Sequence, residues 1–172
     1  MTGSGIRCLT WAILDNHFHM LLRPGIVSVS TLMRRLLIGY AVSHKRRHNR
    51  SGHLFQNRYK STLCQKYPYL LELVRYIHLN PLRAGIVSDM NQPDAYPFPG
   101  HGILMGNQTN EWQDTDDALV RFGRRASEAR YGYRQFFGNG APNISDDGKA
   151  KAEKFALIHF LTNCIFQITF LS

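Results

Sequence analysis

The sequence predicts a mixed α+β fold, because two kinds of apolar pattern alternate along the chain. Short apolar runs rich in strand formers are separated by segments whose apolar residues recur at helical spacing. Of the 172 residues, 44% are hydrophobic and 19% are charged, as in ordinary globular proteins. Length and composition therefore favour one domain, or one domain with a tail. They exclude a wholly disordered, a collagen-like or a polytopic membrane chain.

The first predicted elements are a strand region and a basic helix. Residues 8–22, CLTWAILDNHFHMLL, read as one or two buried strand segments with a break near Asp15 and Asn16. Ser28 or Ser30 can then cap a helix. Its apolar side falls at helical spacing on Leu32, Met33, Leu36, Leu37, Tyr40 and Ala41. Its remaining surface is crowded by Arg34, Arg35, Lys45, Arg46 and Arg47.

Three further segments complete the ordered part of the prediction. Residues 53–64 should be extended, with Leu54 or Phe55 as core candidates. A second helix should follow, with Pro68 in its first turn and Pro81 just past its end. The core stripe of that helix is expected on Leu70, Val74 and Ile77. After a loop rich in proline and glycine, a polar helix is expected over about 114–137.

The last part of the chain reads as a linker followed by an uncharged tail. Residues 138–154 are rich in Gly, Asn, Asp and Lys, as linkers are. Residues 155–172 carry no charge over eighteen positions, a length at the lower edge for a membrane span. His159, Asn163 and Gln167 argue against a span, because each polar group would need a partner in lipid. We therefore expect a buried strand or helix there, and no membrane association.

The positive charge is concentrated in the first hundred residues. Lys and Arg total 21 against 12 Asp and Glu, a net charge of +9. Residues 1–100 hold 13 basic and 4 acidic side chains, and the remainder hold 8 of each, so the first part carries the whole excess. Between Asp15 and Glu72 there are ten basic residues and no acidic one. A polyanion partner is predicted, and a basic surface that only confers solubility is the alternative.

The cysteines and the amino terminus suggest a reduced compartment. Cys8, Cys64 and Cys164 lie far apart, so they form neither a disulfide framework nor a CxxC metal knuckle. The first residues, MTGSGIRC, do not resemble a secretory signal. A cytoplasmic protein is expected.

Two pairs of polar residues could carry chemistry. His17 and His19 flank one residue on a predicted strand, so both imidazoles point to the same face and could hold a divalent metal. Tyr76 and Asn80 are four apart on the second helix and share a face. The tyrosine could be a nucleophile, and the amide oxygen could be a third metal ligand. From spacing alone the alternatives stay open: HxH arises by chance, and a half-buried tyrosine followed by a helix-ending Asn-Pro is common.

Four segments in order resemble the single-tyrosine HUH transposases, most closely the branch associated with repetitive extragenic palindromes. They read NHFHMLL, LMRRLLIGYA, RRHNRSGHLFQNRYKS and LVRYIHLNPLRAGIV, and the resemblance covers about residues 8–105, more loosely to about 137. It implies that His17 and His19 bind Mg2+ or Mn2+, that Tyr76 is the nucleophile, and that Asn80 completes the metal site. The implied reaction is cleavage and rejoining of single-stranded or hairpin DNA through a 5′-phosphotyrosine link. The implied fold is ferredoxin-like, an antiparallel sheet with helices on one face.

The resemblance also orders the remaining candidates. With DNA as the implied partner, the candidates for phosphate contacts are Arg34, Arg35, Arg46, Arg47, Arg58 and Lys60, with Phe55 or Tyr59 as stacking partners for bases. A solvated basic face is the alternative. Tyr59, surrounded by cations, and Tyr40, on the basic helix, are rivals that family position ranks below Tyr76. His78 lies two residues from Tyr76 on a helix, so it points elsewhere and is a poor candidate base. Pro81 biases Asn80 out of helical geometry, which could move its amide away from the histidines.

The resemblance divides the chain and predicts that its fold is incomplete. Residues 1–105 form the catalytic domain, 106–137 a polar helical extension, 138–154 a linker and 155–172 a hydrophobic tail of unknown role. Family members carry about one strand and one helix more before the HUH strand, so the chain is expected to be truncated at its amino terminus, with an exposed sheet edge. A catalytically inactive DNA-binding remnant is therefore the alternative to an active enzyme. Relatives include monomers and dimers, so a homodimer is a possible state.

Overall fold

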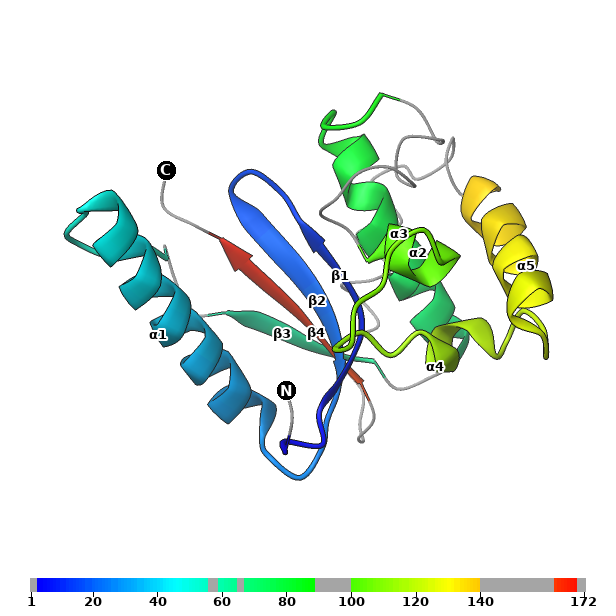
Figure 1. Cartoon of the computed structure of the whole chain (residues 1–172), viewed down its shortest axis with the longest axis horizontal. Coiled ribbons are helices and arrows are strands. Elements are labelled where there is room, and N and C mark those ends of the chain that lie inside the picture. The colour runs from blue at the N-terminus through cyan, green and yellow to red at the C-terminus, as the bar shows by residue number, and fades with distance from the viewer. Residues whose placement is uncertain (1–2, 56–58, 65–66, 89–99, 140–162, 170–172) are drawn as a thin grey trace.

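The computed structural model describes residues 3–55, 59–64, 67–88, 100–139 and 163–169, and it has a mixed α+β fold as predicted (Figure 1). The elements, in chain order, are β1 (Arg7–Ile13), β2 (His17–Arg23), α1 (Val29–His48), β3 (Lys60–Cys64), α2 (Tyr67–Arg83), α3 (His101–Met105), α4 (Asp116–Leu119), α5 (Ala126–Gly138) and β4 (Asn163–Thr169). Arg58 and the 138–154 linker, apart from its first two residues, lie outside the described residues.

The sheet has four antiparallel strands in the order β1-β2-β4-β3. β1 and β2 form a hairpin whose turn falls at the predicted break, and the Leu14 N–H donates to the His17 carbonyl across 2.8 Å. β4 comes from the uncharged tail and lies between β2 and β3, with Phe18 opposite Ile168 and Ser61 opposite Phe166. Of the two structures expected for the tail, the strand is the one formed by its described residues, 163–169. No helix among the described residues has the length and apolar character to cross a membrane.

The sheet is covered on both faces, so the expectation of helices on one face is wrong. One apolar cluster joins Leu9, Ala12 and Leu21 of the hairpin to α2, α3, α4 and α5. A second cluster joins Met20 and Leu22 to Met33 of α1. Since neighbouring residues of a strand point to opposite faces, the two clusters lie on opposite sides of the sheet. Figure 1 accordingly shows α1 on one side of the sheet and α2 to α5 on the other.

Helix α1 begins where a cap was predicted. The Ser28 hydroxyl accepts from the Thr31 N–H at 3.3 Å, and this satisfies one of the free donors of the first turn. Met33 is the only fully buried side chain of the helix, whereas Leu36 and Tyr40 of the predicted apolar side are 41% and 48% exposed. The helix therefore rests on the sheet by a narrower stripe than its sequence spacing predicts.

Helix α2 continues through its proline, contrary to the expectation that it ends before Pro81. The first turns bury Leu70, Val74 and Ile77, the predicted core stripe. Pro81 lies in the last turn, and the Asn80 carbonyl still accepts from the Ala84 N–H at 2.8 Å. Asn80 consequently keeps helical backbone geometry, contrary to the bias expected from the proline that follows it.

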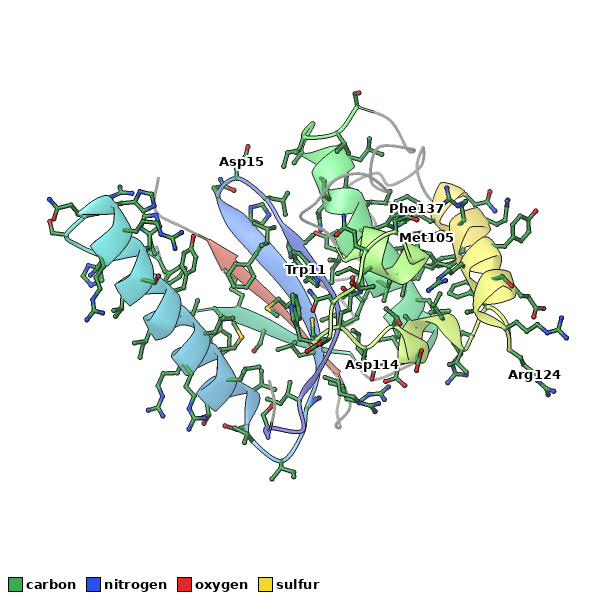
Figure 2. All side chains as sticks on the ribbon, in the orientation of Figure 1. Trp11, Asp15, Met105, Asp114, Arg124 and Phe137 are labelled. Atoms are coloured by element: carbon green, nitrogen blue, oxygen red, sulfur yellow. The ribbon has the colours of Figure 1, made fainter. Side chains whose placement is uncertain are left out.

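The segment after α2 covers the outer edge of β1 and then forms the helical layer. The Gly100 N–H donates to the Trp11 carbonyl and the Asp114 N–H to the Cys8 carbonyl, both at 2.7 Å. The β1 edge is thus partly paired rather than exposed. Residues 114–137 form two helices instead of one, and α5 is amphipathic, with Tyr133 and Phe137 buried. Figure 2 shows Phe137 and Met105 in this layer on the α2 side of the sheet.

Candidate active site

The two histidines of β2 lie side by side on the face that α2 covers. The centroids of the His17 and His19 rings are 5.0 Å apart, and the rings meet edge to face at 83°. His19 is 4% exposed, whereas His17, next to the hairpin turn, is half-buried. The prediction that strand alternation aims both imidazoles at one region is therefore confirmed.

Neighbouring groups leave His17 with a nitrogen suited to a metal. The Nδ1 of His17 is 2.7 Å from the Asn16 side-chain oxygen. Because an amide oxygen only accepts, Nδ1 carries the proton, and Nε2 keeps a lone pair. A second hydrogen bond of this kind orients the histidine ligands of many metal sites.

Burial keeps both imidazoles neutral at physiological pH. It lowers the pKa of His17, and it lowers the pKa of His19 to about 4, with a smaller contribution from the nearby His17. The neutral imidazole is the form that binds a cation. The electrostatics of the pair therefore suit a metal site.

Tyr76 reaches the same place from α2. Its ring centroid is 6.0 Å from that of His19, and the two rings meet at 81°. Tyr76 is half-buried and packs partly against the core, so its ring is held between helix and sheet. The structure thus brings together His17, His19 and Tyr76, which come from separate parts of the sequence.

Asn80 lies one helical turn beyond Tyr76 and has a polar atom to spare. It is 8% exposed, and its side-chain nitrogen has no hydrogen-bond partner among the described residues. A half-turn of the amide would put the oxygen in that position, and an amide oxygen is a ligand that Mg2+ and Mn2+ accept. The donor set of two imidazoles and one amide fits a divalent cation. No group of three or more His, Cys, Asp or Glu side chains in the described ranges is placed to hold a metal ion.

Sequence analysis missed Arg83, in the last turn of α2. Its guanidinium carbon lies over the Tyr76 ring, 4.8 Å from the centroid, in a cation–π contact. Partial burial lowers the pKa of Arg83, and Tyr76 opposes that effect. The spacing of seven residues, two helical turns, places both side chains on one face and could have indicated the contact.

His78 takes no part in this site, as predicted. It is fully buried, and its two nitrogens contact the Thr10 hydroxyl and, at 2.7 Å, the Tyr133 hydroxyl. Burial, and to a smaller extent His101, lowers its pKa well below the usual range. His78 therefore ties β1, α2 and α5 together from within the core.

The predicted DNA-binding residues of α1 lie on the other side of the sheet, whereas Lys60 is in register with Gln167 and His19 and therefore faces the α2 side. Arg34, Arg35, Arg46 and Arg47 are exposed on α1, and Lys60 is exposed on β3. Phe55 and Tyr59 are half-buried against the α1-side cluster, so neither is brought to the histidine pair. Tyr40 also lies on α1. Of the three tyrosines considered as nucleophile, Tyr76 alone has a ring contact with His19 in the described structure.

No protein-family model, no curated protein and no solved structure matches this chain at a significant level. The geometry of the site and the motifs that position it are consequently the basis for inferring function.

Proposed function

We propose that this protein is a metal-dependent transesterase of single-stranded or hairpin DNA, a transposase of the single-tyrosine HUH type, with Tyr76 as its nucleophile. The observation that carries the proposal is the convergence of His17, His19 and Tyr76, with ring centroids 5.0 and 6.0 Å apart. A ferredoxin-like relationship of the fold, a cytoplasmic location and a possible homodimer belong to the same proposal.

The proposed reaction conserves the number of phosphodiester bonds. The phenolic oxygen of Tyr76 attacks the phosphorus of a DNA linkage, and the bond from phosphorus to the 3′ oxygen breaks. The phenolic proton passes to solvent and the departing oxygen takes one up, so the products are a 5′-phosphotyrosine and a free 3′-OH. Attack by another 3′-OH reverses these changes and rejoins strands, with no nucleotide consumed.

A divalent cation, Mg2+ or Mn2+, would be held by His17, His19 and Asn80. Such an ion polarises a phosphate oxygen and offsets the charge that develops during attack. The chain supplies the rest. The contact of the Tyr76 ring with His19 keeps the nucleophile beside the ligands, and this reduces the entropy lost in reaching the attacking geometry.

The basic helix lies at a position from which it could deliver DNA to this site. Figure 1 shows the β1–β2 turn, the last turn of α1 and the last turn of α2 at the same end of the molecule. The last turn of α1 carries Lys45, Arg46 and Arg47. In our proposal a strand crosses this end from α1 to Tyr76, with its phosphates on these cations.

The second candidate function is DNA binding without catalysis. Two observations favour it: the described residues contain no group of three His, Cys, Asp or Glu ligands, and the basic helix covers the face opposite Tyr76. A protein of this kind would bind single strands but would form no covalent product.

A covalent-adduct assay separates the two candidates. Purified protein is mixed with labelled DNA hairpins and Mg2+ or Mn2+, and the products are run on a denaturing gel. If the protein is a transesterase, a protein–DNA band should appear, and it should not form when EDTA is present or when Tyr76 is changed to Phe. Tyr131→Phe, a change on the exposed side of α5, should leave the band intact. Folded wild-type protein that binds the hairpins without any such band would leave DNA binding as the function.

A further inference from the structure

Among the described residues, Arg83 is the one arginine whose guanidinium lies over the Tyr76 ring. Its guanidinium carbon is 4.8 Å from the ring centroid. No carboxylate among the described residues forms an ion pair with it. The residue is more than a third exposed, so its side chain lies between the ring and solvent. An arginine in this position carries an unneutralised charge directly beside the proposed nucleophile.

The other arginine described on α2 shows what a structural role looks like in this protein. Arg75 forms an ion pair with Glu72 and donates to the Phe136 carbonyl at 3.2 Å. Its guanidinium also lies over the Phe136 ring, 4.3 Å from the centroid. Arg75 is therefore engaged in docking α5, whereas no comparable set of protein partners occupies Arg83.

We propose that Arg83 binds the phosphate that Tyr76 attacks, and that the same guanidinium holds the Tyr76 ring in place. This inference rests on the proposed function of Tyr76. A guanidinium that lies over an aromatic ring uses its face, and its N–H donors at the edge remain available to two phosphate oxygens. Arg83 thus places a phosphodiester beside the phenolic oxygen and meets the negative charge that grows on the phosphate oxygens during attack.

The step assigns no proton transfer to Arg83. The new bond forms between the Tyr76 oxygen and phosphorus, and the bond from phosphorus to the 3′ oxygen breaks, as described above. The guanidinium stays protonated throughout, because its role is to hold oxygen atoms that gain charge. Lysine at this position would keep the charge but would lose the flat group that fits both ring and phosphate.

The first test measures binding alone and does not need an active enzyme. In a Tyr76→Phe protein, which keeps the ring, the affinity for a fluorescent single-stranded oligonucleotide is measured against salt concentration. Adding Arg83→Gln should flatten the plot of log affinity against log salt by about 0.7, the value for one phosphate contact. Arg124→Gln removes the same charge from the outer end of the α4–α5 connection (Figure 2) and should leave the slope unchanged.

The second test locates the contact. The hairpin that gives the adduct is used at saturating concentration, and Tyr76 is kept. Compared with the wild-type protein, Arg83→Gln should then form the adduct about 100- to 1000-fold more slowly. Arg83→Lys should recover only part of that loss. A single neutral methylphosphonate at the cleaved linkage should weaken binding to the Tyr76→Phe protein, and should have little further effect once Arg83 is also replaced.

The outcomes separate this inference from the function on which it rests. An unchanged salt slope with Arg83→Gln overturns the phosphate contact, even if adduct formation slows. A flattened slope in a protein that never forms an adduct supports the contact and refutes the transesterase. An adduct formed at the wild-type rate by Arg83→Gln overturns the role in the reaction.

Discussion

Removing the hydroxyl of Tyr133 should destabilise the protein, because that hydroxyl completes a fully buried network. It lies 2.7 Å from Nδ1 of His78, and the Thr10 hydroxyl contacts the other ring nitrogen. All three residues are fully buried. In Tyr133→Phe one imidazole nitrogen would lose its only described partner where water cannot replace it, at a cost of about 1–3 kcal/mol. For a chain of this size the melting temperature should fall by about 2–4 °C for each kcal/mol.

The same helix offers a matched control. Tyr131 stands two residues earlier on α5 and is 67% exposed, so Tyr131→Phe makes the same chemical change in solvent. Its effect should stay within about 0.5 kcal/mol. Urea unfolding, followed by circular dichroism, gives both free energies, and equal slopes against urea show that the comparison is valid. Equal stabilities of the two variants would refute the assignment of His78 as a buried connector.

A double-mutant cycle then tests whether His78 joins the two ends of the network. Thr10→Val removes the partner on β1, and Tyr133→Phe removes the partner on α5. Because both partners act through one imidazole, the two losses should depart from additivity by at least about 0.5 kcal/mol. Additive losses would mean that β1 and α5 are stabilised independently of His78. The network matters for the site because it fixes α2, the helix that carries Tyr76.

Three other predictions concern stability. A Cβ added at Gly25 would overlap the backbone of Gly5, so Gly25→Ala should cost about 1–3 kcal/mol in urea unfolding; a neutral result would contradict the close approach of these segments. Gly39 lies inside α1 with open space around it, so Gly39→Ala should instead raise the unfolding free energy by about 0.5–1 kcal/mol. Burial lowers the pKa values of His78 and His19 below the usual 6.5. As the pH falls, these histidines are therefore protonated in the unfolded chain at a higher pH than in the folded protein. Metal-free protein should therefore be most stable above about pH 6.5 and should lose about 1.4 kcal/mol per pH unit per histidine as the pH falls; a flat profile between pH 6.5 and 5 would contradict the buried neutral histidines.

Local patterns predicted the elements of the site but not all of its surroundings. The alternation of side chains along a strand is enough to put His17 and His19 on one face. The cap of α1 was also predictable, because a serine hydroxyl at that position accepts from a free backbone N–H of the first turn. The contact between His19 and Tyr76 joins residues 57 positions apart, so no local pattern contains it. The resemblance of the motifs to a known family, by contrast, implied that His19 and Tyr76 share a site.

The misplaced features are those that depend on distant partners. Helical spacing shows that α1 has an apolar side, but it does not show which face of the sheet that side covers. The position of β4 between β2 and β3 depends on pairing across more than a hundred residues. Arg83 differs from these, because its distance of two helical turns from Tyr76 was readable in the sequence.

The most direct test of the central claim is to identify the residue that carries DNA in the covalent adduct. Trypsin cuts after Arg75 and Arg83 and releases residues 76–83, a peptide with Tyr76 as its only tyrosine. After nuclease trimming, mass spectrometry should find the nucleotide phosphate on this peptide, and only when Mg2+ or Mn2+ was present. A nucleotide on Tyr59, or on any other residue, would contradict a site built from His17, His19 and Tyr76.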